Sequence, residues 1–99
     1  MQTTRKGYWI IQCQDITDPV AMQKYSEAWA EVADKFGAVL IAGGHQVITT
    51  EGPNITRALV VEYSSYEAAL SCYHSPEYEN AKAFALQAME RTFSIVEGA

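Results

Sequence analysis

Two hydrophobic periods alternate along this chain, and they predict an ordered series of strands and helices. Residues 7–14 are rich in aromatic and β-branched side chains, which is typical of a strand. Alternation places Tyr8, Ile10, Gln12 and Gln14 on one face of that strand and Trp9, Ile11 and Cys13 on the other. Because both faces carry apolar side chains, we expect a central strand that is covered on both sides.

A helix is predicted after this strand, over residues 19–36. Asp18-Pro19 is typical of a helix start, because aspartate accepts a free backbone N–H and proline at the first helical position lacks that donor. Gly37 is the residue expected just beyond the helix end. The apolar stripe at helical spacing consists of Tyr25, Ala28, Trp29, Val32, Ala33 and Phe36.

Three further strands and two further helices are predicted in the remainder of the chain. The strands are expected over residues 38–42, 57–63 and 92–97, and the helices over residues 65–73 and 76–89. Gly43-Gly44 predicts a turn or bulge after the second strand, and residues 45–50 are expected to resume extended structure. Ser64 and Glu67 fit a capping box, which predicts the start of the shorter helix.

The stretch from Cys72 to Tyr78 combines a histidine, a hydroxyl group, a carboxylate and two tyrosines. Ser75-Pro76 within it predicts the start of the last helix. His74 therefore lies just outside a helix start, and two interpretations are open. It either occupies a loop between two helices, or it stands at the mouth of a pocket, where it would transfer a proton or donate a hydrogen bond.

The resulting order is β-α-β-β-α-β, with the second helix interrupted at His74. This is the split β-α-β arrangement, and it predicts an α+β domain with a four-stranded antiparallel sheet and helices on one face. The other face would carry Tyr8, Ile10 and Val60, which are too apolar to remain in water. We therefore expect a homodimer, in which a second copy covers that face.

The length and charge of the chain exclude several classes of protein. Its 99 residues predict one domain over residues 1–99. The net charge of −5 argues against a nucleic-acid surface, which would require a basic patch. No apolar run approaches the ~20 residues that cross a bilayer, and the run from Tyr8 to Ile11 is too short for the core of a signal peptide. We therefore expect a cytoplasmic protein that does not bind membranes.

Neither cysteine spacing nor histidine spacing predicts a metal site. Cys13 and Cys72 are expected to be small core residues, because they form no paired motif. A site built from His45, His74 and Glu62 would lack any recognisable ligand spacing.

Several short stretches of the chain resemble one known family. They are residues 6–10, Asp18-Pro19, Gly43-Gly44, and residues 60–63, 73–78 and 95–98, of which residues 73–78 are the most specific. Together they are similar to the domain-of-unknown-function family 1330, in the dimeric α+β barrel superfamily. The resemblance implies a ferredoxin-like protomer whose sheet packs against that of a second protomer to form a barrel.

The resemblance implies no particular reaction. Relatives in the wider superfamily include cofactor-free monooxygenases of aromatic polyketides, muconolactone isomerases, and haem-binding or haem-degrading proteins. The sequence matches none of their motifs, so no catalytic residue is carried over and no cofactor is expected.

His45, His74 and Glu62 are the candidate catalytic residues. His45 follows two glycines that let the backbone turn sharply. It is either a functional group that binds an acidic ligand or transfers a proton, or a solvated loop histidine. Glu62 interrupts an apolar strand on the face away from the helices. It is either a base in an apolar cavity or an ion-paired residue at the rim, with Arg57, Lys6 or a cation of a second copy as its partner.

Four further residues are candidates for binding a ligand: Tyr8, Gln12, Tyr25 and Tyr73. They would line a pocket of apolar character with a few polar groups, although Tyr25 also fits the core stripe of its helix.

Three functional hypotheses follow from these residues. The first is a cofactor-free enzyme, monooxygenase- or isomerase-like, that acts on a small aromatic or lactone-like compound. The second is a non-catalytic binding protein for a small hydrophobic ligand. The third is a dimeric assembly domain. A cavity in which an imidazole and a carboxylate converge would favour the first hypothesis. A cavity without such a pair would favour the second, and a packed barrel between the two protomers the third.

Overall fold

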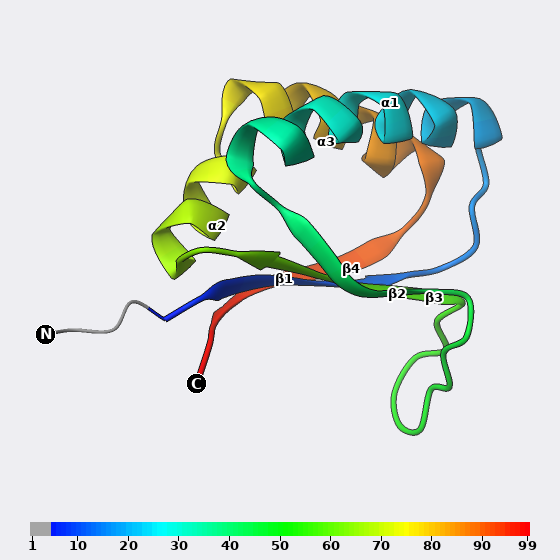
Figure 1. Ribbon diagram of the computed structural model, residues 1–99. Coiled ribbons are helices and arrows are strands. Elements are labelled where there is room, and N and C mark those ends of the chain that lie inside the picture. Colours follow the sequence, from blue (N-terminus) through cyan, green and yellow to red (C-terminus); the bar gives the residue numbers. More distant parts are fainter. Residues whose placement is uncertain (1–4) are drawn as a thin grey trace, which may run out of the picture.

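The computed structural model describes residues 5–99 and shows one sheet covered on one face by helices (Figure 1). In chain order the elements are β1 (Gly7–Cys13), α1 (Pro19–Phe36), β2 (Val39–Gly44), β3 (Arg57–Tyr63), α2 (Tyr66–Tyr73), α3 (Pro76–Ala88) and β4 (Arg91–Glu97). This is the predicted order, with the last helical segment divided into α2 and α3 at His74.

The sheet has the strand order β2-β3-β1-β4, and all its neighbouring strands are antiparallel. β1 is central, as predicted, because it pairs with β3 on one side and with β4 on the other. Residues that face each other across a strand pair point to the same side of the sheet. Trp9, Ile11 and Cys13 of β1 are buried, so their side of the sheet is the one that faces the helices.

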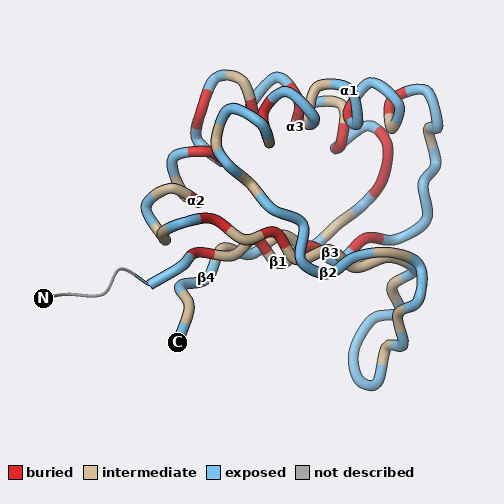
Figure 2. The backbone as a smooth tube through the Cα atoms, viewed as in Figure 1, coloured by how far each residue is buried: buried red, intermediate tan, exposed pale blue. Residues whose placement is uncertain are grey.

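The buried residues gather where the helices and the sheet face each other (Figure 2). Trp9 is at the centre of this core. The indole of Trp9 is fully buried, and its Nε1 donates a hydrogen bond to the carbonyl oxygen of Ala69 in α2 at 3.1 Å. Its ring contacts those of Trp29, Tyr63, Tyr73, Tyr78 and Phe93. One side chain of the central strand thus holds α1, α2 and α3 over the sheet.

The predicted helix starts and stops are largely confirmed. The side chain of Asp18 accepts a hydrogen bond from the N–H of Ala21, and Gly37 ends α1 in the left-handed conformation with φ 66°. The hydroxyl of Ser75 accepts from the N–H of Tyr78 at 3.1 Å and so caps α3. The predicted cap at Ser64 is wrong by one residue, because Ser65 accepts from the N–H of Ala68 and begins α2.

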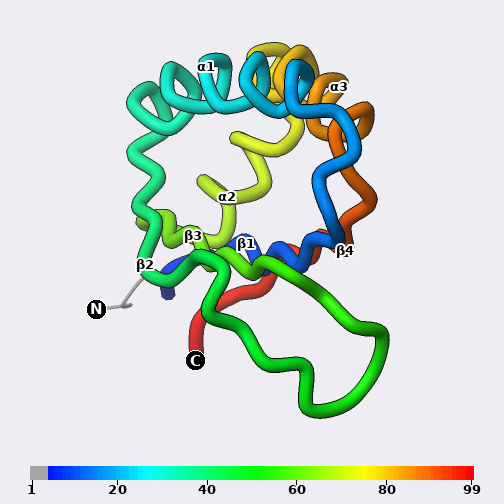
Figure 3. The backbone as a smooth tube through the Cα atoms, turned by 90° about the vertical axis from the view of Figure 1, so that its right-hand side faces the viewer, coloured from blue at the N-terminus to red at the C-terminus, as the bar shows by residue number. Residues whose placement is uncertain are grey.

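The second strand differs from the prediction at its carboxyl end. Gly43 and Gly44 do not break β2; they pair with β3, and the bulge lies earlier, at Ile41. Residues 45–50 do not form an extended strand, because β3 begins only at Arg57 and leaves them without a partner. They belong to a loop that projects from the side of the sheet opposite the helices (Figures 1 and 3).

The side of the sheet away from the helices, called the open face below, carries Tyr8, Ile10, Gln12, Val39, Val60, Glu62 and Val96. Val39 is 53% exposed and Val96 is 46% exposed. Part of this apolar surface therefore lies in water in a single copy of the chain. Within residues 5–99, no helix is both long enough and apolar enough to span a membrane.

Candidate functional site

A partly enclosed space of about 160 Å³ lies between α1 and the helix-facing side of the sheet, and we call it the helix–sheet cavity. Its walls come from α1, from all four strands and from the end of α3. The lining residues are Trp9, Ile11, Cys13, Met22, Tyr25, Ser26, Trp29, Leu40, Arg57, Leu59, Val61, Met89 and Arg91. Most of these side chains are apolar, and the polar ones among them are few.

A chain of hydrogen bonds reaches the cavity through Tyr25. The Nη2 of Arg91 donates to the hydroxyl of Tyr78 at 3.0 Å, and the hydroxyls of Tyr78 and Tyr25 are 3.1 Å apart. Burial raises the pKa of Tyr78, and nearby Tyr25 raises it further while Arg91 lowers it, so the phenol is neutral. When Tyr78 donates its proton to Tyr25, the Tyr25 hydroxyl proton is free to be donated to a group in the cavity.

Two arginines flank one cysteine on the cavity floor. Cys13 of β1 pairs with Arg57 of β3 and with Arg91 of β4, so all three residues lie in one row on the helix-facing side of the sheet. Burial raises the pKa of the Cys13 thiol, and Arg91 and Arg57 lower it. Because the net direction is upward, the thiol is protonated near neutral pH and is not a nucleophile there.

Tyr25 is the one predicted ligand-binding residue that lines the helix–sheet cavity. Tyr73 is half-buried in the aromatic core and does not line the cavity; its ring contacts those of Tyr78 and Phe93. Tyr8 and Gln12 lie on the open face instead, because they alternate with the cavity-facing residues of β1. The structure therefore divides the predicted pocket between the two sides of the sheet.

The three predicted catalytic residues lie apart from the cavity. Glu62 is on the open face, where Lys6 donates a hydrogen bond to it at 3.1 Å and the hydroxyl of Tyr8 donates another at 3.2 Å. This is the ion-paired alternative of the two that the sequence left open. His74 is exposed between α2 and α3, and its imidazole lies edge-to-face against Tyr73, with 5.4 Å between the ring centres. His45 is exposed in the loop after β2. Their catalytic roles stay predictions.

Sequence reasoning considered Arg57 only as a possible partner of Glu62 and overlooked Arg91. Both residues line the cavity and supply its charges, and Arg57 lies on the side of the sheet opposite Glu62. A signal for Arg57 was present, because it has the same parity as Leu59, Val61 and Tyr63 and therefore points to the same side of β3. A charged residue at the start of an otherwise apolar strand face marks the rim of a core.

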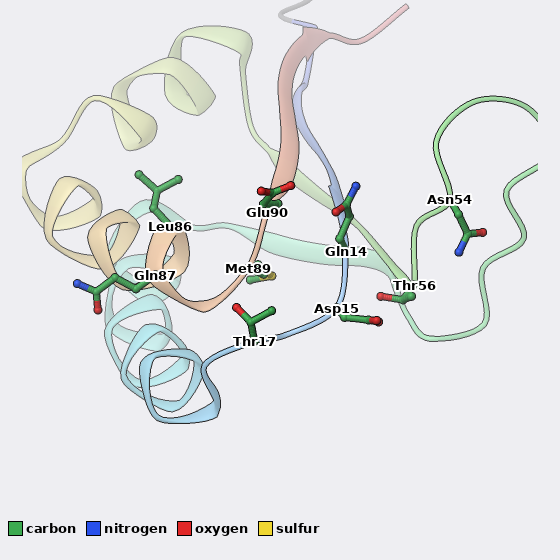
Figure 4. Close-up of a pocket in the computed structure, with 9 residues that line it drawn as sticks. All are labelled: Gln14, Asp15, Thr17, Asn54, Thr56, Leu86, Gln87, Met89 and Glu90. Atoms are coloured by element: carbon green, nitrogen blue, oxygen red, sulfur yellow. The ribbon is translucent and has the colours of Figure 1, made fainter.

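A larger cleft of about 650 Å³ lies open at the surface nearby (Figure 4). It is lined by Gln14, Asp15, Thr17, Asn54, Thr56, Leu86, Gln87, Met89 and Glu90, which come from the ends of β1 and α3 and from the loop before β3. Most of these side chains are exposed, so water competes with any ligand there. Met89 lines both spaces and separates the surface cleft from the helix–sheet cavity.

Within residues 5–99, no three histidine, cysteine or acidic side chains cluster in a way that could hold a metal ion. The helix–sheet cavity itself contains cationic groups, which would repel one.

The comparison with protein families adds a finding to this geometry. The model of the family described as Domain of unknown function (DUF1330) matches residues 6–99. The chain belongs to the DUF1330 family. No significant match was found among curated proteins.

Solved structures share the fold of this DUF1330 chain. A protein of unknown function from Rhodopseudomonas palustris is 15% identical, with a TM-score of 0.75 over 96% of this chain and 83% of that one. A dimeric ferredoxin-like protein of unknown function from Thermobifida fusca is 12% identical, with a TM-score of 0.63 over 98% and 94%. The hydroxynitrile lyase of Passiflora edulis is 8% identical, with a TM-score of 0.66 over 99% and 96%. These likenesses establish a ferredoxin-like fold for the DUF1330 chain.

Proposed function

We propose that this DUF1330 protein binds one small, mostly apolar compound in the helix–sheet cavity. The observation that carries the proposal is a mostly apolar space whose lining includes Tyr25, Arg57 and Arg91 as polar residues. Pockets that bind small molecules have this character, with a few polar groups that fix the orientation of the ligand.

The volume of the cavity limits the size of the compound. An apolar cavity of about 150 Å³ is known to hold a benzene molecule. At about 160 Å³, the helix–sheet cavity accommodates one six-membered ring with a short substituent. Fused multi-ring compounds exceed it, because pockets for ligands of that size occupy about 300–1,000 Å³.

The chemistry of the lining favours binding over proton abstraction. Among the described residues, no imidazole or carboxylate lines the cavity, and the thiol of Cys13 is protonated near neutral pH. A general base with a pKa near neutrality is therefore missing from the lining. The binding hypothesis is thus favoured over the hypothesis of a histidine- or glutamate-dependent enzyme.

A cofactor-free enzyme is the second candidate, and the hydrogen-bond chain from Arg91 through Tyr78 to Tyr25 favours it. In that chain the Tyr25 hydroxyl is held in place and can donate a proton to a small aromatic or lactone-like substrate. The hydroxynitrile lyase of Passiflora edulis shares the fold, which supports small-molecule chemistry on this scaffold by analogy alone.

We further propose that the protein is a homodimer whose two open faces pack together. The exposed valines on that face support this, as does the description of the Thermobifida fusca structure as dimeric. Light scattering after size exclusion should give twice the chain mass at micromolar concentration. Val96→Lys should weaken the dimer, whereas Val20→Lys, at a 65% exposed position on α1, should not. A monomeric wild type would contradict the proposal.

A cavity-filling variant tests the binding function. Val61 lines the cavity from β3 and is buried, so Val61→Phe places extra volume inside it. Calorimetry and NMR with a panel of monocyclic aromatic and alicyclic compounds, both neutral and charged, should show binding to the wild type and its loss in Val61→Phe. Val20→Phe, the same change at an exposed position, should bind normally. Equal binding by both variants would place the ligand outside the cavity and refute the proposal.

A further inference from the structure

We propose that the ligand of the helix–sheet cavity carries a carboxylate, which Arg57 and Arg91 receive, on a ring-sized apolar body. This inference rests on the proposed function and specifies its ligand class.

The two arginines are placed to act on one group. Both pair with Cys13 in the sheet, one from each side, so their Cα atoms are two strand spacings apart, which is about 10 Å. Their side chains point to the helix-facing side, and both line the cavity. Two guanidinium groups that rise from one row of the sheet can therefore contact the same small anion from opposite sides.

Arg57 has an unused hydrogen-bond donor. Its Nε is buried and donates to no partner among residues 5–99. An unsatisfied buried donor costs about 1–3 kcal/mol, and more when the group is charged, so such groups call for an explanation. A ligand oxygen in the cavity would satisfy Arg57 through a charge-assisted bond.

Arg91 is already oriented but keeps free donors. One Nη atom is bound to the hydroxyl of Tyr78, and the guanidinium lies over the ring of Phe93 at 4.9 Å. A guanidinium has five N–H donors, so Tyr78 and Phe93 hold the group in place without exhausting it. The arrangement is that of a preorganised anion receptor.

The charges in the cavity are not balanced by the protein. In the part of the chain that the structure describes, no aspartate or glutamate lines the cavity. Within residues 5–99, the ion pairs involve Arg5, Lys6, Lys35 and Lys82 as cations, and neither Arg57 nor Arg91. Because a partly buried cation is stabilised by a counter-charge, the missing negative charge is assigned to the ligand.

The remaining walls define the body of the ligand and the type of anion. Trp9, Trp29 and Leu59 present apolar surface, which suits an aromatic ring or a branched alkyl group. A planar carboxylate matches the fork of a guanidinium. It also leaves room for a ring within about 160 Å³, whereas a tetrahedral phosphate ester takes up more of that space.

The test compares three probes that share a phenyl ring: benzoate, its neutral planar analogue benzamide, and phenyl phosphate. Calorimetric titration of the wild type should show benzoate binding about 10–100-fold more tightly than benzamide, which is the range for hydrogen bonds to a charged group. Benzoate should also shift the Nε–H resonance of Arg57 in ¹H–¹⁵N spectra. These two measurements need no variant and therefore do not depend on the folding of a mutant.

Variants then assign the effect to a residue. Arg57→Gln should abolish the preference for benzoate over benzamide. Arg5→Gln, the same change in a 63% exposed side chain, should preserve it. Loss of the preference in both variants, or in neither, would overturn the assignment to Arg57.

The outcomes separate this inference from the proposed function. Equal affinities for benzoate and benzamide, with both lost in Val61→Phe, would overturn the carboxylate and keep the cavity as a binding site. Tighter binding of phenyl phosphate than of benzoate would overturn the carboxylate in favour of a phosphate ester. If neither the aromatic and alicyclic carboxylates nor their neutral analogues bind, both proposals are overturned.

Discussion

Replacement of Ser75 by alanine should remove two hydrogen bonds from one buried hydroxyl. The Ser75 Oγ accepts from the N–H of Tyr78 at 3.1 Å as the cap of α3, and it donates to the carbonyl oxygen of Cys72 at 2.7 Å. The side chain is a suitable probe because Ser75 is only 8% exposed, so water cannot readily replace either bond. The single substitution therefore tests how α2 and α3 are joined.

The magnitude follows from the two bonds. Loss of a serine cap costs about 0.5–2 kcal/mol, and a typical second bond contributes about 1 kcal/mol. The carbonyl of Cys72 still accepts from the N–H of Ser75, so it is not left unsatisfied. We therefore expect Ser75→Ala to lower the free energy of unfolding by about 2 kcal/mol, which corresponds to about 8–16 °C in Tm for a domain of this size.

Ser65 provides a matched control, because it caps α2 through the N–H of Ala68 at 3.0 Å and makes only that side-chain bond in the described structure. Ser65→Ala should cost about 1 kcal/mol, the cap alone. Thermal and urea melts of both variants decide the question. If Ser75→Ala loses no more stability than Ser65→Ala, the bond to Cys72 contributes nothing and the reasoning fails.

Two further predictions concern packing and pH. Gly7→Ala should lower the free energy of unfolding by about 1–3 kcal/mol, because the new Cβ would lie 2.5 Å from the carbonyl oxygen of Ser65. Gly37→Ala, where only the left-handed backbone is strained, should cost about 1 kcal/mol in the same melts; equal losses would argue against the clash at Gly7. Burial raises the pKa of both Tyr63 and Tyr78, so above pH ~10 the unfolded state loses phenolic protons that the native state keeps. The free energy of unfolding therefore keeps the full contribution of both tyrosines below pH ~10 and should fall above that pH by about 1.4 kcal/mol per pH unit for each tyrosine. In urea melts, Tyr63→Phe should reduce this dependence on pH. An unchanged slope would contradict the prediction.

The sequence predicted best what depends on near neighbours in the chain. Helix boundaries were predicted correctly at Asp18-Pro19, Gly37 and Ser75-Pro76, because a helix cap involves residues within four positions of each other. The division of β1 into Trp9 and Tyr8 faces likewise follows from simple alternation. These local rules were enough to derive the order of elements.

The errors lie where distant segments decide the outcome. Residues 45–50 have strand-like composition, yet they form a loop because no neighbouring strand extends far enough to pair with them. Arg57 and Arg91 flank Cys13 because of the register in which β3 and β4 pair with β1, and no local sequence pattern predicts that register. Tyr25 was identified as a candidate, but the cavity that it lines exists only because α1 stands away from the sheet.

The pairing of β1 with β4 has a consequence for how the chain folds. Gly7 pairs with Glu97, about 90 residues later, and the N–H of Gly98 donates to the carbonyl oxygen of Lys6 at 2.7 Å. Closing a loop of that length costs about 2.5 kcal/mol more entropy than closing a five-residue hairpin. The other edge of the central strand spans less of the chain, because Cys13 pairs with Arg57, 44 residues later, and with Arg91, 78 residues later. We therefore expect the β1–β4 ladder to form after the β1–β3 ladder, since pairing over a longer separation is slower. Rearranging the chain so that β4 directly precedes β1 would turn this longest-range pairing into a local hairpin and leave the residues that line the helix–sheet cavity unchanged.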